Sequence, residues 1–328
     1  MELTKHLENF GYHPVRHTPG LWKHNTRATI FTLVDDFAIK YASKKYADHL
    51  LQALRAKYTI SMDWEASLYI GITLKWNYTA VNVDLSMPKY VARVLHKFKQ
   101  ALQKFHTDNK SEYSPHKHVE PNYGQKFQYA EPTNDAPTLD SVDINLIQKI
   151  VGTFLYYGIA VDNTILFALS TISFEQSSAT SNTAKKITQL LNYLATNPDA
   201  TIRYKRSDMV LWVHSDASYL SLPKARSRAG GMYFLSDKHP SPNNPANFEP
   251  TLNRIVYLVC KILRNIMESA AEAELGGLFL NCQESVPIRI TLEEMGHPQP
   301  PTPVQVDNST ALGIATIYDF TRDRKSVV

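Results

Sequence analysis

Three acidic residues in the last third of the sequence have the types and positions that metal-dependent hydrolysis requires. Asp216 and Asp307 each follow a short apolar run typical of a β-strand, and Glu274 lies between them in a segment with helical periodicity. Clustered carboxylates repel one another unless cations neutralise them, and Mg²⁺ prefers oxygen ligands. We therefore predict that Asp216, Glu274 and Asp307 are catalytic and bind Mg²⁺ or Mn²⁺.

Two bound ions can activate a water molecule and stabilise the leaving oxygen of a phosphodiester, so these residues predict cleavage of a nucleic-acid backbone. Each residue also has an ordinary structural explanation. A strand-end aspartate is commonly a turn residue or a helix cap, and Asp307-Asn308-Ser309 has the composition of an N-cap segment. Glu274 follows Glu268 and Glu272, as on a solvated helix face. The order of the three carboxylates along the predicted elements favours the metal site.

The elements that position these residues form a predicted α/β unit over residues 206–328. Ligand sites in open sheets collect beyond the carboxyl ends of strands, so two strand-end aspartates and one helical carboxylate can converge. The predicted order is three strands, two helices, a strand and a helix, at residues 209–214, 231–235, 255–263, 267–281, 287–295, 303–306 and 309–315. Gly296 is expected to end the second helix.

A second acidic pair, Asp35 and Asp36, separates two β-rich runs at 30–34 and 37–41. Two residues between such runs predict a tight hairpin. Val34-Asp35-Asp36 resembles the Val-Asp-Asp hairpin of reverse transcriptase palms, and this resemblance implies that both aspartates are catalytic and hold Mg²⁺ against an incoming triphosphate. Adjacent aspartates are also common in turns that bind no metal.

The rest of the sequence predicts an α+β segment over 1–105, a polar linker over 106–140 and a helical region over 141–205. The first segment continues after the hairpin with a helix, a pair of strands and a second helix. Prolines are scattered through the linker, as in a long surface loop. Apolar stripes at helical spacing mark three helices in the third region, and we assign them to the core.

Basic residues precede the second strand of the α/β unit at alternating positions, namely Lys224, Arg226 and Arg228. Residues spaced by two share one face of an extended segment, so this trio is predicted to contact a phosphate backbone. The alternative is a solvated basic loop. A further basic group precedes the first strand of the unit: Arg203, Lys205 and Arg206.

The overall composition excludes few classes of protein. The chain has 328 residues, 43% of them hydrophobic, and a net charge of +4, which permits a nucleic-acid partner without requiring one. Cys260 and Cys282 have no metal-ligand spacing. The sequence contains no apolar stretch of membrane-spanning length and no signal-peptide pattern. We expect an intracellular protein, cytoplasmic or nuclear, with no membrane partner; its oligomeric state is left open.

Four ordered blocks resemble the ribonuclease H region of copia-type retrotransposon polyproteins. They are Ser-Asp-Ala-Ser-Tyr at 215–219, residues 226–234 with Gly230-Gly231, Ser-Ala-Ala-Glu-Ala-Glu-Leu at 269–275 and Val-Asp-Asn-Ser-Thr-Ala at 306–311. The resemblance implies a ribonuclease-H-like mixed sheet with helices and metal-dependent cleavage of RNA in an RNA–DNA hybrid. It also implies that Asp216, Glu274 and Asp307 are the metal ligands, with Glu272 as the alternative if the helix register differs by two.

Blocks in the first two thirds resemble the reverse transcriptase palm and connecting helices of the same family. They are Val-Asp-Asp at 34–36 and residues 18–22, 68–72, 85–91, 151–156 and 190–194. The resemblance implies a C-terminal fragment of a Pol polyprotein. On this view 1–105 is a truncated α+β palm, 141–205 is the helical connection and 206–328 is a C-terminally truncated ribonuclease H domain.

The sequence departs from the family pattern at both ends. The family carries a further metal-binding aspartate well upstream of the hairpin, and a fourth acidic ribonuclease H residue after a basic segment like residues 322–326. Asp319 and Asp323 precede the expected position of that residue. Two alternatives follow, namely an inactive relic that at most binds nucleic acid, and a structural protein that reuses the fold.

We predict that the chain alone does not extend a primer, because the upstream palm aspartate is needed together with Asp35 and Asp36. A primer-extension assay with the purified chain, a primed template and Mg²⁺ measures this directly. Templated synthesis by the isolated chain would overturn the prediction.

Overall fold

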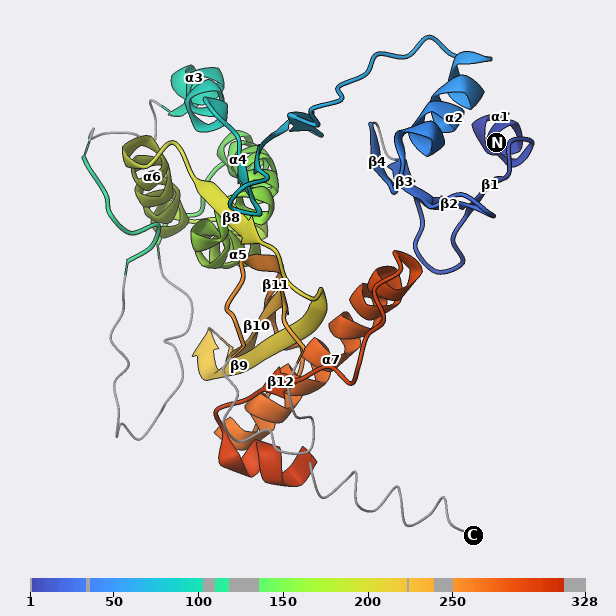
Figure 1. The fold of residues 1–328 in the computed structure, drawn as a ribbon. Coiled ribbons are helices and arrows are strands. Elements are labelled where there is room, and N and C mark those ends of the chain that lie inside the picture. The colour runs from blue at the N-terminus through green and yellow to red at the C-terminus, as the bar shows by residue number, and fades with distance from the viewer. Residues whose placement is uncertain are drawn as a thin grey trace.

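Groups of strands and groups of helices follow one another along the chain, and the strands form three four-stranded sheets (Figure 1). The computed structural model describes residues 2–33, 36–102, 110–117, 136–222, 224–238 and 250–315. Two sheets in these residues are antiparallel, and the third is mixed because one of its strand pairs is parallel. This arrangement confirms the mixed α/β class. None of the described helices combines the length and apolar character needed to cross a bilayer.

The N-terminal part of the chain forms an antiparallel sheet and two helices. Its elements are α1 (Glu2–Glu8), β1 (Tyr12–Pro14), β2 (Leu21–His24), β3 (Thr29–Leu33), β4 (Phe37–Tyr41) and α2 (Lys44–Arg55). The predicted hairpin is present, because β3 and β4 pair antiparallel and Leu33 lies opposite Phe37. The apolar side of α2 joins one buried cluster with this sheet, formed by Leu7, Tyr12, Trp22, Phe31, Leu50, Ala53 and Leu54.

The second sheet joins strands that lie far apart in the sequence. It consists of β5 (Leu68–Tyr69), β6 (Ile72–Asn77), β7 (Asn82–Ser86) and β8 (Thr201–Lys205), in that order. Leu85 of β7 lies opposite Ile202 of β8 and packs on the helices inserted between these two strands. The helices therefore fold back onto the sheet that precedes them.

The inserted helices share one apolar core. They are α3 (Tyr90–Leu102), α4 (Ser141–Ala160), α5 (Leu166–Glu175) and α6 (Ser181–Thr196), with the 3₁₀ turns η1 (Asn163–Ile165) and η2 (Gln176–Ser178). α4 begins where the Asp140 carboxylate accepts a hydrogen bond from the backbone N–H of Asp143, and α6 begins with a Thr180–Thr183 capping box. The apolar stripes predicted from the sequence meet in a single buried cluster.

The predicted linker is described only at residues 110–117 and 136–140. The backbone N–H of Glu112 donates to Thr196 Oγ1 of α6 at 3.2 Å, and Gln189 Nε2 of the same helix donates to the carbonyl of Ser114 at 3.2 Å. The first of these stretches is therefore bonded to α6.

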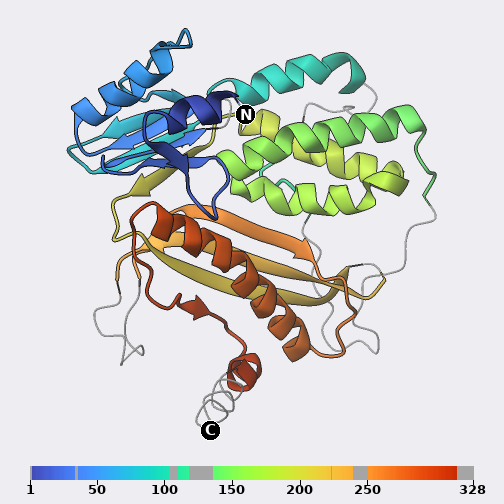
Figure 2. The ribbon, with the colours of Figure 1, turned by 90° about the vertical axis from the view of Figure 1, so that its right-hand side faces the viewer.

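The C-terminal part of the chain forms the mixed sheet, in the order β11-β10-β9-β12. Its elements are β9 (Val210–Leu222), β10 (Arg226–Ser236), β11 (Ile255–Ile262), α7 (Ala270–Glu294) and β12 (Val304–Gln305), followed by helical residues 309–315. In Figure 2, α7 runs along the front of this sheet. The buried core between them consists of Leu211, Val213, Tyr233, Val259 and Leu292.

The first strand of this sheet is longer than predicted. The strand expected at 209–214 continues to Leu222, because its second half pairs with β10 as far as Arg226. Asp216 therefore lies in the middle of β9, and the prediction that it ends a strand is wrong.

The long helix α7 replaces the two helices predicted at 267–281 and 287–295, and it contains Pro287. A proline inside a helix costs about 3 kcal/mol, because it removes a backbone hydrogen bond and crowds the preceding turn. Ile288 and Leu292 follow the proline and pack on the sheet, which favours continuation of the helix. Gly296, with φ of 88°, follows the end of the helix as predicted.

A buried amide fixes α7 to the sheet. Asn281 Nδ2 donates to Ser215 Oγ and to the carbonyl of Gly230, each at 2.8 Å, and Asn281 Oδ1 accepts from the Tyr233 hydroxyl at 2.9 Å. A Cβ atom at Gly231 would lie 1.9 Å from Asn281 Oδ1, so only glycine leaves room for this amide.

We expect Asn281→Ala to lower the free energy of unfolding by about 1–3 kcal/mol, because buried polar groups on two strands lose their partner. Gln283→Ala is the matched control, since Gln283 is exposed on the same helix. We expect the control to change the stability by less than about 0.5 kcal/mol. Denaturant unfolding followed by circular dichroism measures both values. Equal losses for the two variants would contradict the role assigned to the buried amide.

Candidate metal centre

The carboxylates of Asp216, Glu274 and Asp307 converge on one point of the C-terminal unit. One oxygen from each residue lies within 4.8 Å of the other two. Asp216 comes from the middle of β9, Glu274 from the start of α7 and Asp307 from the residues just after β12. The predicted convergence is present, and metal binding stays a prediction.

Glu274 is the buried member of the group, with an exposed fraction of 7%. Its Oε2 atom is buried and has no hydrogen-bond partner among the described residues. Burial raises the pKa of Glu274 to about 7, a backbone hydrogen bond from Ala217 opposes the shift, and the nearby carboxylates of Asp216 and Asp307 add to it. A buried anion beside two others is stabilised by a cation, so the site fits a divalent metal ion.

The ordinary structural explanations do not account for these three residues. Asn308, not Asp307, caps the helix at 309–315, because Asn308 Oδ1 accepts from the backbone N–H of Ala311 at 2.9 Å. Glu272 accepts a hydrogen bond from the backbone N–H of Glu268 at 2.6 Å and so satisfies a backbone donor just before α7 begins. Asp216 lies within a strand and not in a turn. The carboxylates that converge are therefore free of capping roles.

Small residues on α7 allow the helix to approach β9, and the sequence analysis missed them. A Cβ atom at Gly277 would lie 3.2 Å from the backbone oxygen of Asp216 and 3.2 Å from Ala217 Cβ. Ala273, Gly277 and Asn281 are all buried and recur every four residues. That spacing could have indicated the face of the helix that packs on the sheet, because residues four apart share one face of a helix.

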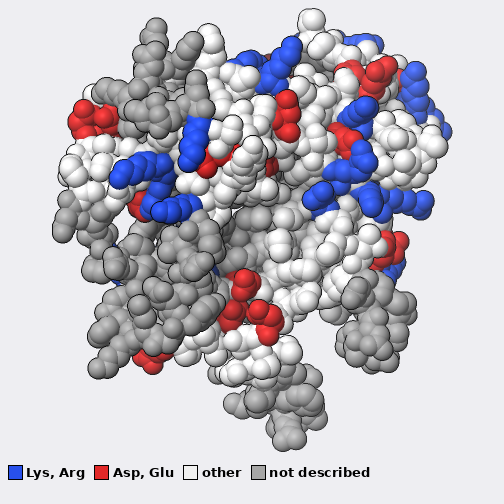
Figure 3. Space-filling model, turned by 90° about the vertical axis from the view of Figure 1, so that its left-hand side faces the viewer, with Lys and Arg blue, Asp and Glu red and all other residues white. Residues whose placement is uncertain are grey.

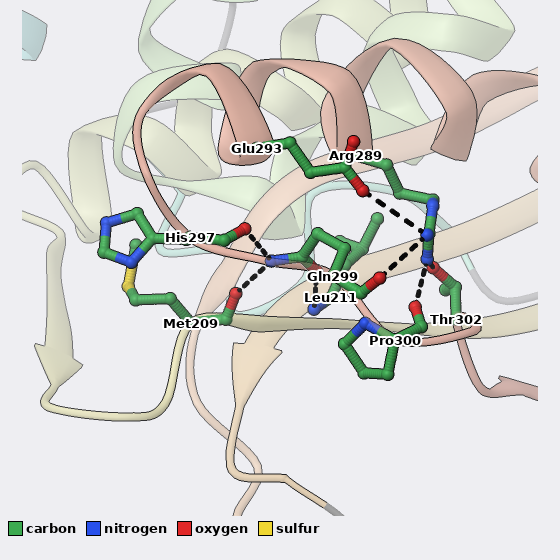
Figure 4. A network of polar contacts seen from close by, with 8 residues as sticks. All are labelled: Met209, Leu211, Arg289, Glu293, His297, Gln299, Pro300 and Thr302. Carbon is green, nitrogen blue, oxygen red and sulfur yellow. Dashed lines mark hydrogen bonds and ion pairs between the residues drawn. The ribbon is translucent and has the colours of Figure 1, made fainter.

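A network of polar contacts fixes the segment that carries the chain from α7 to Asp307 (Figure 4). Gln299 bonds the start of β9, since its Oε1 accepts from the backbone N–H of Leu211 at 3.0 Å and its Nε2 donates to the carbonyl of Met209 at 2.8 Å. Arg289 of α7 donates to Thr302 Oγ1 at 2.7 Å and to the backbone oxygen of Gln299 at 3.1 Å. These bonds tie the segment to both the helix and the sheet.

The second predicted acidic pair is only partly described. Asp35 lies outside the described residues, as do Asp319 and Asp323 near the end of the chain. Asp36 is exposed, and its Oδ2 accepts from the backbone N–H of Ile70 at 3.3 Å. Asp36 belongs to no group of potential metal ligands among the residues that the structure describes.

The predicted phosphate contacts divide into exposed and buried residues. Lys224 is exposed in the turn between β9 and β10, and Arg226 is half-buried. The prediction for Arg228 is wrong, because this side chain is only 5% exposed.

Arg228 is enclosed by α5, which comes from an earlier part of the chain. Its Nη1 donates to Ser170 Oγ at 2.8 Å and its Nη2 to Thr171 Oγ1 at 3.1 Å, while the guanidinium lies 4.6 Å from the centre of the Phe167 ring. The pairing of β9 and β10 also shifts register between Arg226 and Arg228, so simple alternation does not describe this stretch.

A scan against protein-family models found no match to the chain, and a search of solved structures likewise found none.

We expect Glu274→Gln to stabilise the metal-free protein at pH 8 by about 1–3 kcal/mol, because the wild-type carboxylate is charged and buried there. Because folding raises the pKa of Glu274, the contribution of this residue to the free energy of unfolding is fully present below about pH 4.5. It is lost as pH rises through about 7. The difference between the two proteins should therefore vanish near pH 4.5. Thermal unfolding at several pH values, with and without Mg²⁺, measures the effect.

Mg²⁺ should stabilise the wild-type protein at pH 8 and leave the Glu274→Gln variant nearly unchanged. Glu272→Gln serves as the control, since this residue lies on the same helix outside the converging group. An equal response to Mg²⁺ in all three proteins would remove Glu274 from the site.

Proposed function

We propose that the C-terminal part of the chain hydrolyses phosphodiester bonds with divalent metal ions held by Asp216, Glu274 and Asp307. We further propose that its substrate is the RNA strand of an RNA–DNA hybrid. The observation that carries the proposal is the convergence of three carboxylates, one of which, Glu274, is buried and has an oxygen with no partner among the described residues. All three ligands offer oxygen, which favours Mg²⁺ or Mn²⁺ over softer metals.

The sequence blocks that resemble copia-type ribonuclease H support this substrate. Residues 215–219 lie in β9, 226–234 in β10, 269–275 at the start of α7 and 306–311 directly after β12. Blocks that are distant in sequence but adjacent in space are expected of a common site. On this basis we propose that the unit is a ribonuclease-H-like domain from a copia-type Pol polyprotein.

We further propose that the first two thirds of the chain are reverse transcriptase palm sequence and its helical connection. The support for this is the β3–β4 hairpin with Asp36 beside its turn, together with the resembling blocks at 151–156 in α4 and 190–194 in α6. Polymerase activity is not part of the proposal.

Each ligand has a distinct part in the proposed reaction. Asp216 and Asp307 are exposed, so their oxygens face the side from which a substrate can approach. Glu274 contributes from the buried side, where packing restricts its movement. Bound metal ions would supply an activated water and stabilise the leaving oxygen. Because Glu274 must lose its proton before it binds a cation, we expect activity to rise between about pH 6 and pH 8.

Exposed basic residues of the chain can contact a phosphate backbone. Lys224 is exposed in the turn after β9 and Lys205 is exposed on β8, whereas the Arg203 guanidinium forms an ion pair with Asp84 of β7 at 2.6 Å. Figure 3 shows Lys and Arg side chains spread over the upper half of one face, above a small group of acidic side chains. Phosphate contacts provide affinity without sequence preference, and a hybrid is recognised by its shape and its 2′-hydroxyls.

We expect the purified chain to cleave the RNA strand of a labelled RNA–DNA hybrid with Mg²⁺ and to leave it intact with EDTA. Asp216→Asn should reduce the rate by at least about a hundredfold, because a metal ligand of the reacting centre is lost. Glu272→Gln is the matched control and should keep the wild-type rate. Denaturing gel electrophoresis of the labelled strand measures all three rates.

Cleavage that survives in Asp216→Asn or persists in EDTA would point to a contaminating nuclease and contradict the proposal. Hybrid binding with no cleavage by the wild-type chain would favour the alternative of an inactive relic that at most binds nucleic acid.

A further inference from the structure

A pocket of about 480 Å³ lies in the N-terminal unit, between α2 and the turn that joins β2 to β3. Its volume falls in the range usual for small-molecule sites. None of its residues belongs to the candidate metal centre. The pocket is lined by Arg27, Lys45, Tyr46, Asp48, His49 and Gln52.

The Arg27 guanidinium in this pocket faces a group that cannot accept its hydrogen bond. His24 Nδ1 accepts from the backbone N–H groups of Thr26 at 3.0 Å and Arg27 at 3.1 Å, so the ring proton of a neutral His24 lies on Nε2. His24 Nε2 is 2.7 Å from Arg27 Nη1, which is also only a donor. With this tautomer His24 Nε2 does not accept a hydrogen bond from Arg27, and no other acceptor for the guanidinium lies among the described residues.

The histidines beside Arg27 are neutral near pH 7. Burial lowers the pKa of His24, and the charge of Arg27 lowers it further, so the ring is neutral near pH 7. The same two causes lower the pKa of His49, whose Nδ1 lies 3.0 Å from the hydroxyl of the buried Tyr12. Arg27 thus lies among neutral rings.

The second cation of the pocket also has no ion-pair partner among the described residues. Lys45 lies 5.1 Å from the centre of the Tyr46 ring, and neither Lys45 nor Arg27 forms an ion pair with any described carboxylate. Asp48 is the one carboxylate in the lining, so the lining carries two cations and one anion. This balance favours an anionic ligand.

We propose that this pocket binds a phosphate group, carried by a nucleotide or by a nucleic-acid chain. The planar fork of Arg27 can donate two parallel hydrogen bonds to phosphate oxygens, and Lys45 can add a further donor. The bound phosphate would supply the acceptor that His24 cannot. The site is independent of the carboxylates of the C-terminal unit.

The test uses the full chain in a phosphate-free buffer with three probes: inorganic phosphate, a nucleoside 5′-monophosphate and a short single-stranded oligonucleotide. Isothermal titration calorimetry measures their affinities. We expect Arg27→Gln to weaken binding by about tenfold or more and Lys45→Ala by a smaller factor, because each removes a charged donor. Arg55→Gln is the control, since it removes the same charge from α2 at an exposed residue outside the pocket.

The three probes separate the sources of the phosphate. Binding of the monophosphate identifies a nucleotide, and binding of the oligonucleotide alone identifies a nucleic-acid chain; both support the proposal if Arg27→Gln weakens them. Loss of affinity in Arg55→Gln equal to that in Arg27→Gln overturns it, because general surface charge would then be the cause. Absence of binding by all three probes also overturns it.

One further variant, Glu274→Gln, separates this result from the outcome of the nuclease proposal. Glu274→Gln should bind the probes as the wild type does, so failure of the nuclease proposal leaves this one standing. If Arg27→Gln fails to fold, Lys45→Ala still decides the matter, because Lys45 is exposed.

Discussion

The distance at which α7 packs on β9 determines the rest of the candidate site. Gly277 faces Asp216 and Ala217 so closely that an added Cβ atom would already be in tight contact with both. Glu274 lies one turn earlier on the same helix and is brought beside Asp216 by this approach. One turn later, Asn281 bonds both β9 and β10 and so restricts rotation of the helix. The positions of the acidic side chains are therefore set by packing contacts that lie outside the site.

The same packing creates an unfavourable electrostatic arrangement in the metal-free chain. Burial raises the pKa of Glu274 to about 7, and the neighbouring carboxylates act in the same direction. Near neutral pH the residue therefore either keeps its proton or leaves a buried charge without a counter-ion. A divalent cation reverses this balance, because the closely spaced anions then become ligands. Strongly shifted pKa values of this kind are concentrated at functional sites.

The order of strands and helices predicted which residues converge, although Asp216 lies in the middle of β9 and not at its end. The sequence did not predict the length of β9, since the residues beyond Asp216 are held in the strand by a long-range partner, β10. Pro287 predicted a break between two helices, but the apolar residues that follow it pack on the sheet and stabilise one continuous helix. Arg228 was assigned to the surface from alternation, yet α5, an element from another part of the chain, covers it. In each case a contact distant in sequence outweighs the local signal.

The most direct test of the account is to locate a bound metal ion. Crystals of the protein grown with Mn²⁺ at pH 8 should show an anomalous scattering peak between the side chains of Asp216, Glu274 and Asp307. Crystals of Glu274→Gln grown in the same way should show a much weaker peak or none. Wild-type crystals with no manganese between these carboxylates, or with manganese bound only elsewhere, would contradict the claim that the three residues form a metal centre.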